Sequence, residues 1–426
     1  MRRVVCTIAT RRRLPQVRAL AWSLRSNVPT VDLLVLVLDD RCFEVNTAGE
    51  PFAVVWPPSL GIARFELLAA MHAAPELELV ITPAFLRYAL DWADGPVLHL
   101  ACDALVYASL ERIFTLVTQR RLVLVPRICE PVPRDHVRLS DVEIARSGVF
   151  DRGCVALTPC EPIDAFLCAW SDRLEYDLGD EVPLASSRFL DFAPAFVEDA
   201  AVLRDPALGV SRLNLHERVI TRTAARFEAN QRALVLVHFD GLDGAEEPHP
   251  DPFAGPIDGG PRSPEDRLGT PQALREKLQR QLLIRHPALA QLVRERAQML
   301  MRCGAADAER LEYGYARLAD GTPLSRRLRL LVRDGERYGA LDGSPFNAEG
   351  THRLLAWLNG PAQRGGAVGV SRYWFEIYRE RPDVQIIHSD LDGAGALGFL
   401  RWTVTHGRHE YAAPDALVPW DSSRFD

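Results

Sequence analysis

The stretch that decides the fold is Pro96–Leu110, PVLHLACDALVYASL. Its first part, Val97–Ala101, is a short apolar run that follows Gly95 and Pro96. Such a run is typical of a central strand in a parallel sheet, although periodicity alone also allows a buried helix. We expect one exposed acid, Asp103, after this strand and then a turn into a helix. Ligands of open α/β sheets bind outside the carboxyl ends of the strands, so Asp103 is the first candidate for chemistry.

Short apolar segments alternate with segments of helical spacing on both sides of this stretch. The other predicted strands are Val4–Ala9, Val31–Leu38, Phe52–Trp56, Arg121–Pro126, Gly153–Thr158 and Ala233–Gly241. The predicted helices are Leu14–Ser26, Gly61–Ala73, Thr82–Trp92, Glu161–Leu178 and one that starts at Ser140. This alternation predicts an α/β fold with a mostly parallel sheet. The strand ends then bring Thr10, Asp39, Asp40 and Asp103 to one edge.

A change in composition divides the rest of the chain. Residues 244–272 are rich in Pro, Gly, Asp and Glu and nearly free of large apolar side chains. Such a segment is typical of a linker, or of an arm that orders on contact. We therefore expect a first domain at 1–243 and a smaller, mainly helical domain at 273–426. In Ala273–Gly304 the helical pattern is interrupted at Pro287.

The composition limits the function. The chain has 426 residues, of which 47% are apolar and 25% charged, as in a soluble globular protein. A net charge of -7 argues against nucleic acid as a partner. The only lysine is Lys277, so neither a P-loop nor Schiff-base chemistry is expected. No signal peptide or run of membrane-spanning length is evident, and the eight cysteines form no C-x-x-C pair; we expect a cytoplasmic protein with reduced thiols.

The residues alone suggest a metal site. Asp103 lies at one predicted strand end, and His238 and Asp240 lie at another. Carboxylates with one imidazole suit Mn²⁺ or Mg²⁺, with a phosphate-bearing substrate supplying further oxygens. The alternative is that Asp103 caps the following helix.

Other polar groups also allow two interpretations. Asp39 and Asp40 either contact a nucleotide or end a strand in a turn. Ser147 and Gly148 either lie near a ligand or stop a helix. The arginine-rich Arg326–Arg333 is expected to be a solvated face, the alternative being an anion site.

Segments along nearly the whole chain resemble, in order, those of bacterial GT-A-type glycosyltransferases related to the glycosyltransferase 8 group, with their C-terminal helical extension. The segments are VVCTIATRRRLPQVRALAWSLRSNVPTVDLLVLVLDD, VLHLACDALVYASL, RSGVFDRGCVAL, LRDPALGVSRLNLHER, LVHFDG, YGYARLADGTPLSRRLRLLVR, FNAEGTHRLLAWLNGP and SRYWFEIYRERPDVQ. The resemblance implies a GT-A sheet of the nucleotide-diphospho-sugar transferase type, flanked by helices, followed by a smaller helical domain.

The resemblance also implies a nucleotide-sugar donor bound along the strand ends. Thr7, Ala9 and Thr10 would face the nucleoside, and Asp39 and Asp40 would lie near the base or ribose. The implied acceptor is a glycan, a lipid-linked molecule or a protein. A partner glycosyltransferase is a further implied partner.

The metal site follows from the same resemblance. Asp103 matches the second acid of the family's D-x-D motif, and His238 matches a histidine that completes the shell of Mn²⁺ or Mg²⁺. Asp103 would also contact the nucleotide sugar. Ser147 and Gly148 would lie near donor or acceptor.

The chain departs from the family pattern at several motif positions. Ala101 replaces the first acid of D-x-D, Asp151 replaces the asparagine of N-x-G, and Thr82 replaces a common lysine. Ser186 and Ser187 stand where an Asp-Gln pair is expected. The missing carboxylate should weaken a site for a hard cation.

Two functions remain open at this stage. The first is a hexosyltransferase-type glycosyltransferase of cell-envelope polysaccharide or glycan synthesis, with Asp151 and Asp191 as candidate catalytic acids. The alternative is a catalytically impaired GT-A scaffold that serves as a binding or partner module.

Overall fold

The computed structural model describes residues 2–42, 45–133, 144–145, 148–176, 188–242, 283–284, 286–337, 339–362 and 369–419. They divide into two compact units. Of the described residues, those in 2–62, 74–242 and 283–313 form the first unit, and those in 63–73 and 314–419 form the second. The boundaries expected at 243 and 272, and the helix expected at Ser140, lie outside the described residues.

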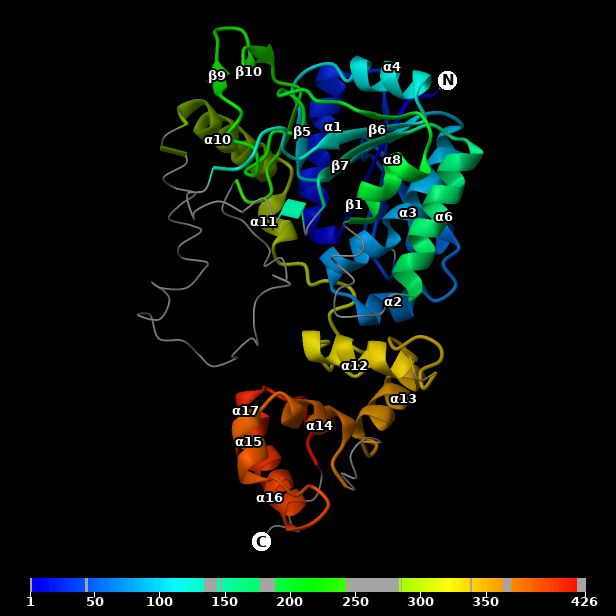
Figure 1. Cartoon of the computed structure of the whole chain (residues 1–426), viewed down its shortest axis with the longest axis vertical. Helices are drawn as coiled ribbons and strands as arrows, with labels where there is room; N and C mark the ends of the chain where they lie inside the picture. Colours follow the sequence, from blue (N-terminus) through cyan, green and yellow to red (C-terminus); the bar gives the residue numbers. More distant parts are fainter. Residues whose placement is uncertain are drawn as a thin grey trace. The chain divides into compact units, whose positions relative to one another are not determined.

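The first unit is a mixed α/β structure built on a seven-stranded sheet flanked by helices (Figure 1). Its strand order is β3-β2-β1-β4-β7-β6-β8. The strands are β1 (Val4–Ala9), β2 (Asp32–Val37), β3 (Ala53–Val55), β4 (Val97–Leu100), β6 (Leu122–Pro126), β7 (Phe150–Leu157) and β8 (Ala200–Val202). Every neighbouring pair is parallel except the two that involve β7, so the predicted mostly parallel sheet is confirmed.

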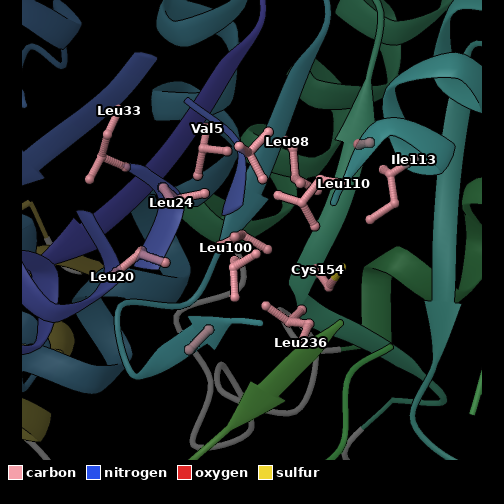
Figure 2. Packing of buried hydrophobic residues seen from close by; sticks show 14 of the residues in the cluster. Val5, Leu20, Leu24, Leu33, Leu98, Leu100, Leu110, Ile113, Cys154 and Leu236 are labelled. Atoms are coloured by element: carbon pink, nitrogen blue, oxygen red, sulfur yellow. The ribbon is translucent and has the colours of Figure 1, made fainter. Parts of the chain in front are cut away.

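Both faces of the central strands are covered, which explains their continuous apolar sequence. All six residues of β1 are buried. On one face, Val5 and Leu98 pack with α1 (Leu14–Asn27) and α4 (Glu111–Gln119) in a single apolar cluster (Figure 2). On the other, α3 (Ala74–Ala93) contacts β1 and β4.

The segment after Asp103 differs from the prediction. Instead of a turn into a helix, Asp103 is followed by a short strand, β5 (Ala104–Val106), and α4 begins only at Glu111. Strand β5 pairs antiparallel with β12 (Leu236–His238), with Ala104 opposite His238. Asp103 therefore caps no helix, and it is buried rather than exposed, at 6% accessibility.

The remaining elements complete the two units. In the first unit they are η1 (Arg11–Arg13), η2 (Pro57–Leu60), α6 (Glu161–Tyr176), η3 (Leu190–Phe192), α8 (Ala193–Phe196), β9 (Ile220–Arg222), β10 (Phe227–Ala229), β11 (Arg232–Ala233), α10 (Pro287–Arg302) and α11 (Ala305–Ala308). In the second they are α2 (Phe65–Met71), α12 (Arg326–Arg337), α13 (Ala348–Asn359), α14 (Arg372–Arg379), α15 (Pro382–Ile387), α16 (Ala394–Trp402), a π-helix (Thr403–Gly407), α17 (Arg408–Glu410) and η5 (Asp415–Leu417). In the described part of the chain, every helix is too short or too polar to cross a lipid bilayer.

The expectation that Arg326–Arg333 forms a solvated face is wrong for two of its arginines. Arg329 and Arg333 are 5% and 4% accessible. Arg329 Nη1 donates to the carbonyls of Ala69 at 2.6 Å and His72 at 2.7 Å, and Arg333 Nε donates to Met71 O at 2.9 Å. These carbonyls at the end of α2 have no partners within their own helix, so guanidinium groups of α12 complete it.

Candidate functional site

A cavity of about 320 Å³ lies in the first unit where β1 and β4 end. Arg12 and Arg13 enter its wall just after β1, Ala101 and Asp103 just after β4, and Asp240 just after β12. Residues of α3, α6, α10 and α11 line the rest. This is the carboxyl edge at which open parallel sheets bind ligands.

Strand β7 adds residues to the same edge because it runs antiparallel to β4. Its beginning therefore lies beside the end of β4, where the Ala101 N–H donates to Gly153 O at 3.0 Å. A Cβ at Gly153 would approach Ala101 Cβ and His238 Cε1 to 2.8 Å each. Ala101 and Gly153 are thus small residues packed at the cavity wall, and the Cβ of Ala101 occupies the position where the family pattern expects an acid.

Asp103 organises the loop after β12. Its Oδ2 accepts the N–H groups of Phe239 at 2.9 Å and Asp240 at 2.8 Å. Burial by itself would raise the pKa of Asp103. The positive charges of His238 and Arg13 and the Asp240 N–H outweigh burial, so the pKa lies below its ordinary value and the carboxylate is ionised.

Asp151 and His238 form a buried ion pair beside Gly153. Asp151 Oδ2 lies 2.8 Å from His238 Nε2, and Asp151 Oδ1 accepts the Gly153 N–H at 2.9 Å. Burial alone would lower the pKa of His238, but the Asp151 carboxylate raises it to about 9. Burial would likewise raise the pKa of Asp151, but His238 lowers it to about 2. Both groups are charged at neutral pH.

This pair predicts a specific dependence on pH. The pKa of His238 lies above its unfolded value, so protonated His238 stabilises the fold fully below pH ~6.5 and this contribution is lost as the pH rises through about 9. For Asp151, whose pKa is lowered, the contribution is present above pH ~4 and is lost as the pH falls through about 2. We expect the free energy of unfolding to fall by about 3 kcal/mol between pH 6.5 and 9.5.

Urea unfolding across this pH range and an NMR titration of the His238 ring together check the prediction. In Asp151→Asn the ring should titrate below pH ~6.5, because burial then dominates its pKa. His352→Gln, a change of an exposed histidine, is the control and should leave the pH profile unchanged. An unaltered His238 titration in Asp151→Asn would contradict the prediction.

Arg152 brings a further positive charge to the cavity wall. It follows Asp151 in β7 and lines the cavity. Its Nε is buried and has no hydrogen-bond partner among the described residues. Burial and the neighbouring Arg127 lower the pKa of Arg152 to about 10, so it is still a cation at neutral pH. A guanidinium in a cavity wall that still has an N–H without an acceptor favours an anionic ligand.

The residues predicted to bind the nucleoside do not line this cavity. Thr7, Ala9 and Thr10 are all buried at the end of β1. Asp39 Oδ1 accepts the N–H of Arg11 at 2.7 Å, and Asp40 Oδ2 accepts the N–H of Val45 at 2.8 Å. The two acids thus hold the loops that follow β1 and β2, in agreement with the alternative that they end a strand in a turn.

The other predicted residues lie apart from the cavity wall or outside the description. Asp191 Oδ1 accepts the N–H groups of Val149 at 3.0 Å and Phe150 at 3.4 Å, so it holds the start of β7. Gly148 is buried with φ 95°, a conformation that suits glycine. Ser147 lies outside the described residues. Of the predicted site residues that the structure describes, Asp103 and Asp240 line the cavity.

The donor atoms present do not fit a divalent cation. No group of three or more His, Cys, Asp or Glu side chains within the described ranges is placed to hold a metal ion. Asp103 Oδ2 already accepts two backbone N–H groups, and His238 Nε2 is paired with Asp151. The same wall carries four arginines, whose charges repel a cation, beside four acids. The arginines are Arg12, Arg13, Arg152 and Arg296, and the acids are Glu78, Asp103, Asp240 and Glu309.

The sequence pattern does not single out these arginines. Arg152 lies inside the segment RSGVFDRGCVAL, between the motif positions Asp151 and Gly153. The signal that could have indicated Arg152 is its position: it is a basic residue at the start of a strand, two positions before the buried Cys154. Arg296 belongs to α10, nearly two hundred residues after β4, and no local pattern indicates that it reaches the cavity.

Comparisons with known proteins identify similar structures but no family. No family model matches the chain, and a search of curated proteins finds no match. The glycosyltransferase GlyE of Streptococcus pneumoniae TIGR4 is 15% identical with a TM-score of 0.31, over 48% of this chain and 45% of GlyE. The chain therefore matches less than half of the length of GlyE.

Two further glycosyltransferase structures show a similar degree of likeness. Mouse xyloside xylosyltransferase 1 is 12% identical with a TM-score of 0.34, over 56% of this chain and 97% of that one. The galactosyltransferase LgtC, in complex with donor and acceptor sugar analogs, is 12% identical with a TM-score of 0.32, over 49% of this chain and 76% of LgtC.

Proposed function

We propose that the chain is a glycosyltransferase that transfers a sugar from a nucleoside diphosphate to an acceptor hydroxyl. The observation that carries this proposal is Arg152, a cation in the wall of a cavity at the carboxyl edge of the sheet, with no hydrogen-bond partner for its Nε among the described residues. A diphosphate offers the acceptor oxygens that this guanidinium lacks. The sequence resemblance to GT-A-type glycosyltransferases supports the same ligand.

The chemistry requires stabilisation of a leaving diphosphate. The bond between the anomeric carbon and the terminal phosphate oxygen breaks, the acceptor oxygen bonds to that carbon, and the hydroxyl proton is released. Negative charge grows on the departing diphosphate, and a fixed cation beside it lowers the barrier. In the proposed reaction Arg152 supplies this charge.

The two predicted catalytic residues, Asp151 and Asp191, have different roles in the proposed reaction. Asp151 is a positioning residue, because it fixes the ring of His238 behind Gly153 through the ion pair at 2.8 Å. Asp191 holds the backbone of β7 and takes no part in the transfer. The resemblance points to cell-envelope polysaccharide synthesis as the pathway and to a glycan as the acceptor.

Release of free nucleoside diphosphate from UDP-, GDP- and dTDP-linked sugars tests the function. We expect the wild-type protein to release one of the three faster than a protein-free blank. Arg152→Met should lower kcat/KM by about 100-fold or more, because the charge that meets the leaving group is removed. Arg87→Met removes an exposed arginine of α3 that pairs with Asp164 at 2.7 Å outside the cavity, and it should leave the rate unchanged.

The possible outcomes separate the two functions considered from the sequence. Nucleotide binding without release or transfer of the sugar would contradict the transferase and favour the impaired scaffold. Absence of binding by all three nucleotides would contradict a donor site altogether.

A further inference from the structure

We propose that this cavity binds the donor diphosphate without a divalent cation, with arginine side chains supplying the positive charge. The inference rests on the proposed function and concerns the same site. It departs from the Mn²⁺ or Mg²⁺ that the resemblance implies, and it follows from how the donor atoms are already used.

The acid that would anchor a cation, Asp103, already accepts hydrogen bonds from the protein backbone. Asp103 is 6% accessible, and its Oδ2 accepts two N–H groups at 2.9 and 2.8 Å from consecutive residues, Phe239 and Asp240. These bonds hold the loop after β12. Hard cations with six or more oxygen ligands need several free carboxylate oxygens. Here the position two residues before Asp103 is Ala101, which has no carboxylate, and its Cβ would lie 2.8 Å from a Cβ added at Gly153.

The imidazole that would complete a metal shell, that of His238, is also already paired with a carboxylate of the protein. His238 Nε2 lies 2.8 Å from Asp151 Oδ2, and the side chain of His238 is only 10% accessible. Strand β7 brings Asp151 to this position because it begins beside the end of β4. A metal bound at Nε2 would have to displace the carboxylate from its partner.

Four guanidinium groups line the same cavity from three different elements. Arg12 and Arg13 belong to η1, Arg152 to β7 and Arg296 to α10. Arg13 lies 3.6 Å from Glu78, and Arg296 is 2% accessible, with its Cζ 4.8 Å from the Phe239 ring centroid. Arg152 Nε has no partner among the described residues. Guanidinium groups bind phosphate oxygens in pairs and stay charged, so they can replace a cation.

Equilibrium binding with and without metal tests the inference. UDP, GDP and dTDP are titrated into the metal-free protein in EDTA and into the protein with excess Mn²⁺ or Mg²⁺. For the nucleotide that binds, we expect Kd values within about two-fold of each other in the three buffers. Arg152→Met should weaken binding by about ten-fold or more in EDTA, with no recovery in Mn²⁺. Arg87→Met is the matched control and should bind as wild type does.

Each other outcome identifies which idea fails. Binding that tightens ten-fold or more with Mn²⁺ would overturn metal independence and leave the proposed function standing. A loss of the free Mn²⁺ EPR signal that is larger with protein and nucleotide together than with nucleotide alone would do the same. Binding by Arg152→Met equal to wild type would also overturn the inference. No binding in any buffer would overturn the proposed function and this inference with it.

Discussion

Asp103→Ala is expected to lower the free energy of unfolding of the first unit by about 3–5 kcal/mol in metal-free buffer. The substitution removes the acceptor of two buried N–H groups, those of Phe239 and Asp240, and it removes one of the negative charges that face His238 and Arg13. Urea unfolding in EDTA, followed by hydrogen exchange of the Phe239 and Asp240 amides, measures the loss and locates it.

The neighbouring acid provides the control. Asp240 is exposed and lines the same cavity, so Asp240→Ala should change stability by less than about 0.5 kcal/mol. A carboxylate whose only role is to bind an added cation would behave differently. Its removal would relieve its repulsion by the neighbouring carboxylates in the metal-free protein, and stability would not fall. Unchanged or increased stability of Asp103→Ala in EDTA would therefore refute the structural role described for Asp103.

The second large effect is expected in the second unit. Arg329→Met should destabilise that unit by about 3–5 kcal/mol, because Arg329 donates to the carbonyls of Ala69, Ala70 and His72 through Nη1 and to Tyr315 O through Nη2. Methionine fills much of the volume but donates nothing, so buried carbonyls at the end of α2 lose their partners. Amide exchange of α2 and thermal unfolding report the effect.

Arg326→Met is the matched control for this change. Arg326 is the first residue of the same helix, is exposed, and should be replaceable at a cost within about 0.5 kcal/mol. Equal stability of the Arg329→Met and Arg326→Met proteins would show that the carbonyls of α2 do not depend on α12.

The parts of the fold set by local pattern could be predicted from the sequence. Val4–Ala9 is a strand with the predicted bounds, and α1 extends the predicted helix by one residue. Strand β8 was missed because Ala200–Val202 is too short and too small to show a pattern, and it forms only by pairing with β6. The sequence predicts a turn into a helix at Ala104–Val106, because no local pattern indicates that this segment pairs with β12.

The candidate site was predictable only in outline. Ligands of open sheets bind where the strands end, and this rule correctly predicts that Asp103 lies at the cavity. The rule does not predict side-chain contacts, and these contacts decide the role of each residue. Asp103 bonds to residues 136 and 137 positions away. Thr10, Asp39 and Asp40 lie at strand ends, as predicted, yet they are buried or hold loops. Arg329 shows the same limit: the pattern treats arginine as polar and exposed, whereas distant carbonyls determine its position.

The dependence of α2 on α12 has a consequence for biosynthesis. Helix α2 ends at Met71, and its partner Arg329 emerges from the ribosome roughly 250 residues later. At 5–20 residues per second, the nascent chain carries α2 unpartnered for on the order of 10–50 s. During that interval the apolar side chains of Phe65, Leu67 and Leu68, buried in the finished protein, lack their final packing. Residues 65–71 are therefore the part of the second unit that is synthesised long before its partner helix α12.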